Sequence, residues 1–232
     1  MQRGVIRAMP ADIPAVAKRN TVYSIFVPTK KEAEQIFESD RFFLHNGFTG
    51  LEYKNFFIII TGIGKVNTTM TVTKYLLSGE KLPPLLLGIA GAYRGTLDVG
   101  EICIINTDYF VDECLPGENP PSLTGTHEIG FPICEDNKTS FITPSSFNFK
   151  VCSANTVSML SGTDELANLY HLKTGASVES MEGAAFGLAC SSFNLGAVQI
   201  RAVSNYCGER KNQQWNVKKA VQAIQDVLHL IG

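Results

Sequence analysis

Short apolar runs alternate with longer segments of helical periodicity, and this alternation constrains the fold more than any other feature of the sequence. A continuous apolar run of about five residues is typical of a strand that is buried on both faces. The clearest case is Phe56–Ile60, which Gly62-Ile63-Gly64 separates from a helix-length segment at Val66–Leu77. Strands that alternate with helices indicate a largely parallel sheet covered on both faces.

The same pattern recurs along the chain. We predict strands over Val22–Val27, Phe56–Ile60, Leu85–Ile89, Glu101–Asn106, Tyr109–Val111, Val151–Ala154 and Ala197–Val203. We predict helices over Lys30–Phe37, Val66–Leu77, Asp164–Leu172, Met181–Phe193 and Trp215–Ile231. The stretch from Leu115 to Phe149 carries five of the ten prolines, so it is predicted to be loop-rich and to form a lid or pocket wall.

Length and charge limit the class of protein. A chain of 232 residues fits one fairly large domain. Lys and Arg number 20 against 22 Asp and Glu, so the net charge of −2 supplies no basic excess for nucleic-acid binding. No apolar run approaches the roughly 20 residues of a membrane-spanning helix, so we expect no membrane partner.

The first 20 residues and the cysteines predict the setting of the protein. Residues 1–20 lack the unbroken apolar segment of a signal peptide, and we expect them to form a poorly ordered extension of a domain that covers residues 21–232. The six cysteines form no Cys-x-x-Cys pair, which favours reduced thiols and a cytoplasmic location.

Several motifs of cofactor and metal sites are absent from the sequence. Gly62-Ile63-Gly64-Lys65 has neither the spacing nor the final hydroxyl residue of a Walker A loop, and Gly88-Ile89-Ala90-Gly91 lacks the glycine pair of a dinucleotide fingerprint. No Gly-x-Ser-x-Gly elbow occurs, and no histidine has a metal-ligand spacing. We therefore expect no cofactor and no metal.

Two polar clusters interrupt apolar surroundings. Glu179 and Glu182 fall at the predicted start of a helix that is rich in small apolar residues. A first-turn glutamate that favours the helix dipole explains them as well as a ligand-binding carboxylate does. Arg201-Ala202-Val203-Ser204-Asn205 ends the last predicted strand, where a simple asparagine turn is the alternative.

Taken together in chain order, five segments resemble the purine nucleoside phosphorylase and nucleosidase superfamily over roughly residues 22 to 231. They are Thr29-Lys30-Lys31-Glu32, Gly62-Ile63-Gly64-Lys65-Val66, Gly88-Ile89-Ala90-Gly91, Glu179-Ser180-Met181-Glu182-Gly183-Ala184 and Arg201-Ala202-Val203-Ser204-Asn205. Within the superfamily, residues 178–183 and 204–210, with Trp215 shortly after, are most similar to the futalosine hydrolase branch. The resemblance implies a single three-layer α/β/α domain with a central mixed, largely parallel sheet, and a homodimer or higher homo-oligomer.

The resemblance also implies roles for individual residues. Glu182 matches the carboxylate that binds the ribose hydroxyls, Met181 packs on the sugar, and Glu32 matches the acidic residue that deprotonates the attacking water. Asn205 stands where methylthioadenosine nucleosidases carry the Asp that protonates purine N7. Glu179 is offset by one residue from the first of the two carboxylates that this branch of the superfamily carries in the corresponding segment. The remaining implied substrate contacts are Ser204, Ile89, Ala90, Gly91, Thr156 and Val157.

The chemistry of N-ribosidic cleavage is consistent with these roles. The departing purine gains negative charge and the sugar gains positive charge, so the site needs a donor at the base and a carboxylate at the ribose. The resemblance implies a purine nucleoside and water as the reactants, and hydrolysis of futalosine to hypoxanthine. Arg94, Lys138 and Arg210 are candidates for a cationic contact with the carboxylate of the substrate's 5′ group.

Three alternatives stay open at this stage. A phosphorylase needs phosphate anchors at two positions that hold Leu86 and Ile89 here. A methylthioadenosine, S-adenosylhomocysteine or aminofutalosine nucleosidase is disfavoured by Asn205. A protein that binds purine nucleosides without turnover is disfavoured by the joint presence of Glu32, Glu182 and Asn205, and a base-release assay distinguishes all of these.

Overall fold

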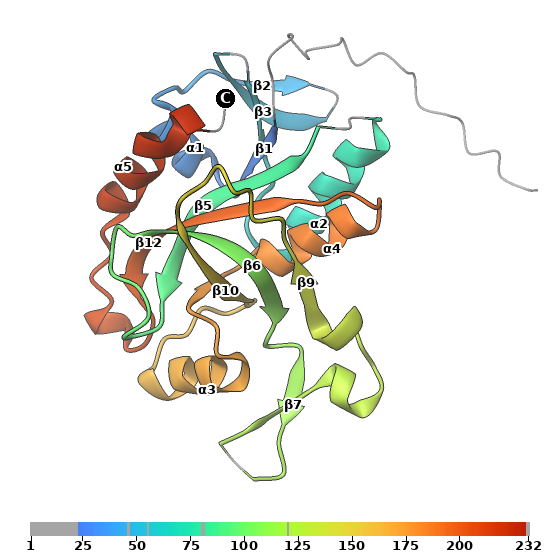
Figure 1. Ribbon diagram of the computed structural model, residues 1–232, viewed down its shortest axis with the longest axis vertical. Helices are drawn as coiled ribbons and strands as arrows, with labels where there is room; N and C mark the ends of the chain where they lie inside the picture. The colour runs from blue at the N-terminus through green and yellow to red at the C-terminus, as the bar shows by residue number, and fades with distance from the viewer. Residues whose placement is uncertain (1–22, 46, 55, 80–81, 120, 231–232) are drawn as a thin grey trace, which may run out of the picture.

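The computed structural model describes residues 23–45, 47–54, 56–79, 82–119 and 121–230 (Figure 1). The predicted extension at residues 1–20 lies outside the described residues. The strands are β1 Ser24–Val27, β2 Phe42–His45, β3 Phe48–Tyr53, β4 Phe56–Ile60, β5 Pro84–Ala92, β6 Ile102–Phe110, β7 Cys114–Pro116, β8 Leu123–Gly125, β9 Lys138–Ser140, β10 Lys150–Thr156, β11 Val178–Ser180 and β12 Val198–Tyr206. The helices are α1 Lys30–Phe37, α2 Gly64–Leu77, α3 Asp164–Thr174, α4 Gly183–Ser191 and α5 Val217–Val227, with short 3₁₀ turns at Thr126–Ile129, Glu135–Asn137, Arg210–Asn212 and Leu228–Leu230.

The described residues build one large mixed sheet in the order β11-β10-β6-β12-β5-β1-β4-β3-β2, with β9 paired to β6. The pairs formed by β1 with β4 and β5, by β12 with β5, and by β10 with β6 and β11 are parallel. Strand β11 also pairs antiparallel with β5, so the sheet curls back on itself around β12 and β6. This curl brings the ends of β5, β11 and β12 together.

Alternating side chains of the central strands form two core layers. Leu85 and Leu87 of β5 pack with Ile36 of α1 and Ile224 of α5, whereas Leu86 between them packs with Phe186 of α4 and other residues of the opposite layer. The period-2 alternation of a strand explains why neighbours face different helices. Helices α1 and α5 thus cover one face, and α2 and α4 cover the other (Figure 1). The predicted three-layer α/β/α fold is confirmed.

Several predicted element boundaries are wrong. The strand expected over Leu85–Ile89 extends over the nine residues of β5, so Gly91, which was expected to turn the chain after it, lies inside the strand. The helix expected over Met181–Phe193 begins only at Gly183 and ends at Ser191, and Glu179 lies in β11 instead of at a helix start. The two strands predicted over 101–111 are one continuous strand, β6. The sequence pattern also missed the β2–β3 hairpin.

The loop-rich stretch from 115 to 149 includes most of β7, all of β8, and β9, which pairs with β6 in the main sheet. Only the part around β7 and β8 projects from the body of the molecule (Figure 1). Asn137 fastens this projection, because its Nδ2 donates to Thr126 Oγ1 at 2.7 Å and its Oδ1 accepts from the Ile133 amide at 2.9 Å. The role of the stretch as a lid stays a prediction.

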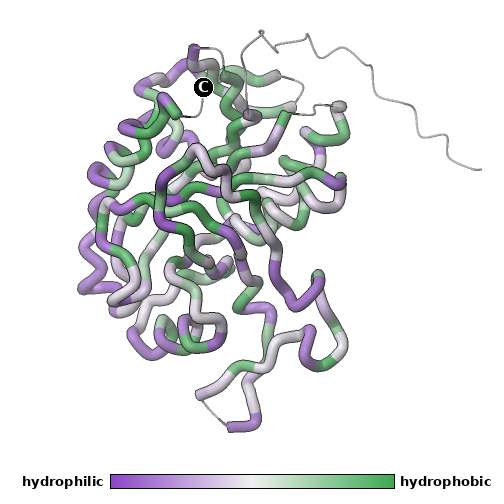
Figure 2. Tube along the Cα trace, viewed as in Figure 1, coloured by the Kyte–Doolittle hydropathy of each residue, from purple (hydrophilic) through white to green (hydrophobic). Residues whose placement is uncertain are grey.

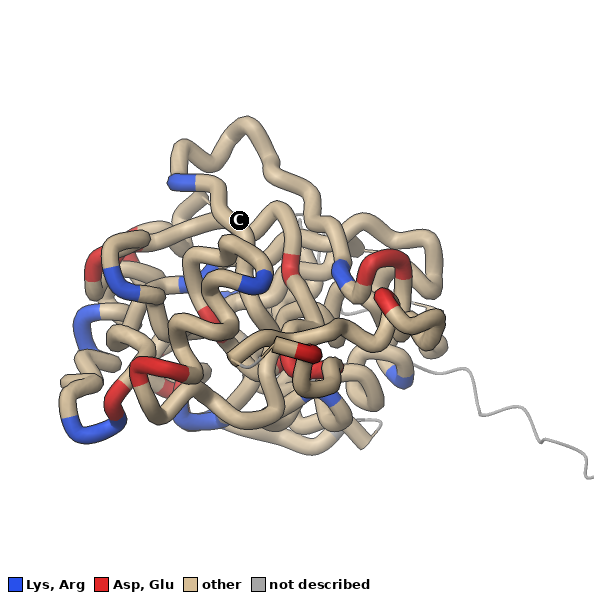
Figure 3. Tube along the Cα trace, turned by 90° about the horizontal axis from the view of Figure 1, so that it is seen from below, with Lys and Arg blue, Asp and Glu red and all other residues tan. Residues whose placement is uncertain are grey.

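Surface character follows the layers. Hydrophobic residues concentrate in the central strands, and hydrophilic residues line the outer helices and parts of the projection (Figure 2). Cationic and anionic residues are interspersed along the chain, without a continuous basic stripe in this view (Figure 3). None of the helices in the described part of the chain is long and apolar enough to cross a membrane.

Candidate active site

Glu32 is held at the first turn of α1 by its own helix cap. Thr29 is the N-cap residue, and its hydroxyl accepts from the Glu32 amide at 3.1 Å and donates to Glu32 Oε2 at 2.7 Å. Glu32 Oε1 accepts from the Ile89 amide of β5 at 3.3 Å. Burial raises the pKa of Glu32 above its ordinary value, and the hydrogen bond from Thr29 opposes that change. The carboxylate is therefore a stronger base than a solvated glutamate.

Arg201 lies at the centre of the site on β12, with no exposed surface. Its Nη1 donates to the Ile89 carbonyl oxygen at 3.4 Å, and its Nη2 lies 3.6 Å from Glu182 Oε2. Nε and Nη2 have no hydrogen-bond partner among the described residues. A buried cation needs its charge balanced, and the Glu182 carboxylate supplies that balance while these two donors are left without a hydrogen bond.

Glu182 is the N-cap residue of α4 and is also buried. Its Oε1 accepts from the Gly64 amide at 3.1 Å, at the N-terminus of α2. Gly64 has a φ of +87°, a conformation that glycine adopts without steric cost. The carboxylate therefore lies between the positive end of a helix dipole and the Arg201 guanidinium.

Gly88 allows the Arg201 guanidinium and the Glu32 carboxylate to lie close together. A Cβ atom at Gly88 would lie 2.5 Å from Arg201 Nη1 and 3.4 Å from Glu32 Oε1. Only a residue without a side chain permits the guanidinium and the carboxylate to lie against the same point of β5. The structure thus brings Glu32 of the first helix and Glu182 of the fourth to one buried arginine.

Asn205 forms the second half of the site, at the end of β12. Its Oδ1 accepts from the Ser204 hydroxyl at 2.8 Å, and its Nδ2 donates to the Tyr206 carbonyl oxygen at 3.1 Å. The register of β12 against β5 shifts between Val203 and Asn205, which marks a bulge at this point. One N–H and one oxygen lone pair of the Asn205 amide remain for a ligand.

Strand β5 connects the two halves through its backbone. The Ala90 carbonyl oxygen lies 3.2 Å from the Ser204 hydroxyl, and a Cβ at Gly91 would lie 3.3 Å from Asn205 Nδ2. Ile89, Ala90 and Gly91 therefore all border predicted site residues. Met181, next to Glu182, is only partly buried.

Glu179 lies apart from the other two glutamates. Its Oε1 accepts from the amide and the hydroxyl of Ser161, at 2.9 and 2.7 Å, and its Oε2 accepts from the Tyr93 hydroxyl at 3.2 Å. Burial raises the pKa of Glu179, and the hydrogen bonds from Ser161 oppose that change. Both oxygens of the carboxylate therefore accept hydrogen bonds within the protein, from Ser161 and Tyr93. A role of Glu179 in substrate binding stays a prediction.

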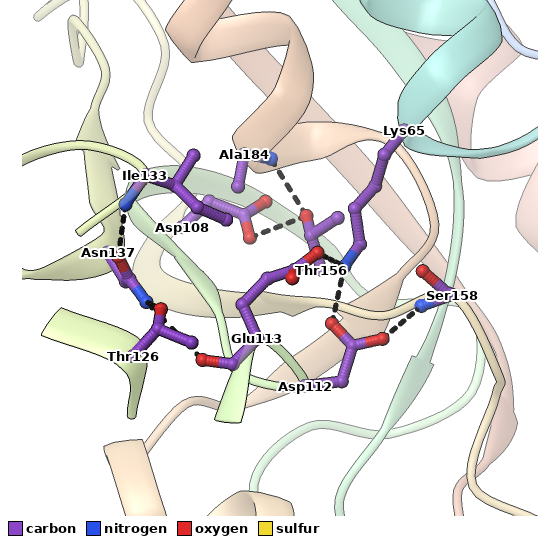
Figure 4. Close-up of polar contacts among 10 residues, drawn as sticks. All are labelled: Lys65, Asp108, Asp112, Glu113, Thr126, Ile133, Asn137, Thr156, Ser158 and Ala184. Carbon is purple, nitrogen blue, oxygen red and sulfur yellow. Dashed lines mark hydrogen bonds and ion pairs between the residues drawn. The ribbon is translucent and has the colours of Figure 1, made fainter. Parts of the chain in front are cut away.

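Thr156 and Val157 lie at the end of β10. The Thr156 hydroxyl donates to Asp108 Oδ1 at 2.8 Å and accepts from the Ala184 amide at 2.7 Å (Figure 4). Val157 is fully buried beside Tyr93 in a separate apolar cluster. The hydroxyl of Thr156 is therefore engaged by two protein partners, Asp108 and Ala184.

An ion-pair cluster borders the site on the side of α2. Lys65 Nζ donates to Asp112 Oδ1 at 2.5 Å and to Glu113 Oε1 at 2.7 Å, while Asp112 Oδ2 accepts from the Ser158 amide (Figure 4). These contacts tie the start of α2 to the segments that follow β6 and β10. We refer to Lys65, Asp112 and Glu113 as the Lys65 clamp.

Three cations were predicted to contact a 5′ carboxylate. Lys138 is paired with Asp136 at 2.8 Å, Arg94 lies over the Tyr206 ring at 5.6 Å, and Arg210 is exposed in a 3₁₀ turn. None of the described residues forms a group of three or more His, Cys, Asp or Glu side chains that could hold a metal ion.

Sequence reasoning missed two charged residues, Arg201 as a site residue and Asp108 altogether. Each is the one Asp, Glu, Lys or Arg residue in its strand, Arg201 in β12 and Asp108 in β6. A charge at such a position is costly unless it is paired, so it is a signal of a buried polar site. Arg201 was assigned only to a polar strand end.

Comparisons with known proteins agree with this geometry. The family model of the phosphorylase superfamily matches residues 2–231. The futalosine hydrolase of Thermus thermophilus is 29% identical over 215 residues, which cover 88% of this chain and 92% of that protein.

Solved structures share the fold. The 5′-methylthioadenosine/S-adenosylhomocysteine nucleosidase of Helicobacter pylori, solved with butyl-thio-DADMe-Immucillin-A, has a TM-score of 0.71 at 17% identity and covers 91% of this chain and 99% of its own. A futalosine hydrolase mutant of the same organism has a TM-score of 0.66 at 20% identity and covers 90% of this chain and 100% of its own. With a family model that spans nearly every residue, the chain belongs to the phosphorylase superfamily.

Proposed function

We propose that this protein hydrolyses the N-ribosidic bond of futalosine and releases hypoxanthine. The observation that carries the proposal is the placement of Glu182 and Glu32 around the buried Arg201. Glu182 Oε2 lies 3.6 Å from Arg201 Nη2, and Glu32 lies with Arg201 against the same point of β5 at Gly88. Arg201 Nε and Nη2 have no hydrogen-bond partner in the described part of the chain. The similarity to the T. thermophilus futalosine hydrolase over most of both chains supports the choice of substrate.

Each carboxylate has a separate task in the proposed reaction. The bond between C1′ and the purine nitrogen breaks with its electron pair leaving on the base, which takes up a proton from solvent at N7, and the oxygen of water forms the new bond to C1′. Glu32, whose pKa burial raises, accepts the proton of that water. Glu182 binds the ribose hydroxyls and stabilises the positive charge that develops on the sugar.

The Asn205 amide supports hypoxanthine as the base. Its remaining N–H can donate to the 6-oxo oxygen, and its remaining lone pair can accept from a protonated N7. The orientation of the amide is fixed, because a flipped amide would direct its oxygen at the Tyr206 carbonyl oxygen. A 6-amino purine would present a donor to the Asn205 N–H and leave both groups unpaired.

Water is favoured over phosphate as the nucleophile. Phosphorylases of the superfamily hold phosphate with an arginine and a hydroxyl residue, and Leu86 and Ile89 occupy those positions here. Leu86 is fully buried against Phe26 and Phe186, so its position offers no donor to an anion.

A second copy of this chain is the proposed partner. Val66 and Met70 lie four residues apart on α2 and are 76% and 66% exposed, and Phe131 of the projection is 73% exposed. Such large exposed apolar side chains favour an interface. Replacement of Val66 and Met70 by Asp should convert the assembly to monomers in sedimentation velocity, whereas Leu172→Asp on α3 should leave it intact. An unchanged assembly in the double variant contradicts this interface.

The direct test is base release from a panel of inosine-type and adenosine-type nucleosides, with and without phosphate. We expect hypoxanthine and the free sugar from futalosine, at a rate independent of phosphate. A ribose 1-phosphate product would indicate a phosphorylase, and adenine from 6-amino substrates would indicate a methylthioadenosine-type nucleosidase. Binding without release of any base would indicate a nucleoside-binding protein.

A further inference from the structure

Asp108 is a fully buried carboxylate that the proposed reaction does not use. It lies on β6 and has no exposed surface. Its Oδ1 accepts from the Thr156 hydroxyl at 2.8 Å, and its Oδ2 accepts from Gln199 Nε2 at 3.1 Å. Two donors on two neighbouring strands, β10 and β12, thus hold one carboxylate in a fixed orientation.

The hydrogen bonds continue from Asp108 into helix α4. The Thr156 hydroxyl has one proton, which it donates to Asp108, and its oxygen accepts from the Ala184 amide at 2.7 Å (Figure 4). The direction of the chain is therefore set: Ala184 N–H to Thr156, and Thr156 O–H to Asp108. Thr156 satisfies one of the amides at the start of α4 that have no partner within the helix.

Asp108 also lies against the backbone next to Glu182. A Cβ atom at Gly183 would fall 1.9 Å from Asp108 Oδ2 and 2.4 Å from Gln199 Nε2. The carboxylate and the amide therefore pack directly on the Gly183 backbone. Glu182 precedes Gly183 as the N-cap of α4 and makes no capping bond with its side chain, which points to Gly64 and Arg201 instead.

We propose that Asp108 and Thr156 are positioning residues that fix the first turn of α4 and thereby set the place of the Glu182 carboxylate. The usual N-cap bond would draw the Glu182 side chain back toward its own helix. Thr156 supplies that bond from a neighbouring strand, so the Glu182 carboxylate is free to face the ribose. This role rests on the proposed function.

The chain offers a matched set of substitutions for the test. Thr156→Val removes the hydroxyl, and Thr156→Ser keeps it. Thr139→Val is the control, because Thr139 is also buried against α4, at Gly187, and its hydroxyl has no hydrogen-bond partner among the described residues. Asp108→Leu is a second variant of similar size that removes the acceptors of both Thr156 and Gln199.

We expect Thr156→Val to lower kcat for base release about tenfold or more with KM changed less than about threefold, because small displacements of a charge-stabilising group act mainly on the transition state. Thr156→Ser should recover kcat to within about threefold of the wild type, and Asp108→Leu should resemble Thr156→Val. Thr139→Val should retain the kcat and KM of the wild type. Circular dichroism and melting temperature establish that each variant is folded.

Two results contradict the proposal in different ways. If the wild-type protein releases no base from any nucleoside, the proposed function fails and this role fails with it. If the wild type is active and folded Thr156→Val matches Thr139→Val in kcat, the positioning role alone is wrong. A loss of kcat that serine does not restore also contradicts it, because the hydroxyl is then not the group that matters.

Discussion

Glu182 is the residue on which most of the site geometry converges. Its two oxygens face the amide of Gly64 and the guanidinium of Arg201, at 3.1 and 3.6 Å. One partner is the positive end of a helix dipole and the other is a guanidinium, so both attract the carboxylate oxygens and hold them in place. A negative charge at this place would stabilise a cationic sugar.

Glu182→Gln should therefore lower kcat by ~10²–10³ while the protein stays folded, because the change keeps the shape and removes the charge. Single-turnover measurements of base release give the rate of the chemical step. Glu32→Gln should likewise lower kcat more than it changes KM. A folded Glu182→Gln protein with the rate of the wild type would reduce Glu182 to a helix-start residue.

Asn205→Asp should change the choice of base. An aspartate accepts from a 6-amino group and, when protonated, can deliver a proton to N7, whereas it loses the N–H that the 6-oxo group needs. We expect kcat/KM to fall for futalosine and to rise for its 6-amino analogue. For each substrate the change corresponds to ~1–3 kcal/mol of transition-state stabilisation. Competition between the two substrates in one reaction measures the ratio directly, and an unaltered ratio would show that Asn205 does not contact the purine edge.

At the scale of elements, the sequence was informative for short segments with a distinct pattern, whereas the longer helices predicted over 181–193 and 215–231 are shorter in the structure, at Gly183–Ser191 and Val217–Val227. Helix α1 and strand β4 match their predicted bounds because an amphipathic or continuous apolar run leaves little choice. The β2–β3 hairpin was missed although the dipeptide Asn46-Gly47 is typical of tight hairpin turns. The predicted start of α4 at Met181 is two residues too early. The helix begins at Gly183, where the close contact with Asp108 leaves no room for a side chain, and no local pattern reveals that contact.

The candidate site was predictable only in part for the same reason. The resemblance to a family indicated Glu32, Glu182 and Asn205, and the structure brings the two glutamates to one arginine. Arg201 was not identified as their common partner, because its role depends on the parallel pairing of β12 with β5. Residues that act through distant segments leave little signal in their own neighbourhood.

The Lys65 clamp joins three elements, and its removal should be measurable. Lys65→Met should lower the free energy of unfolding by about 1–3 kcal/mol, because Lys65 and Asp112 have side chains only 12% and 14% exposed and Asp112 would then face Glu113 unpaired. Urea denaturation measures the change, and Lys65→Met with Asp112→Asn should recover part of it. Lys138→Met, which breaks the exposed pair with Asp136, is the control and should leave the stability unchanged.

At the scale of the whole molecule, buried carboxylates make stability depend on pH. Burial raises the pKa of Asp108 from 3.8 to about 6, with the hydrogen bonds from Thr156 and Gln199 opposing that change. Arg201 also opposes it and Glu182 adds to it. The folded protein therefore binds this proton more tightly than the unfolded chain does.

The free energy of unfolding should consequently gain a contribution from Asp108 as the pH falls from about 6 to about 4, and should lose it again as the pH rises through 6. One pKa unit corresponds to about 1.4 kcal/mol, so the contribution is on the order of 3 kcal/mol. Denaturant unfolding of the wild type and of Asp108→Asn across this range isolates it. Parallel curves for the two proteins would show that Asp108 keeps an ordinary pKa.

Strand β12 has a consequence for synthesis and folding. It follows the other strands of the sheet in sequence, yet it lies between β5 and β6 and carries Arg201, Ser204 and Asn205. Until residues 198–206 have left the ribosome, β5 and β6 each present an unpaired edge, which is a template for misassociation. The nascent chain thus depends on late insertion of a central strand, a non-local step that is slow and a natural point for chaperone assistance.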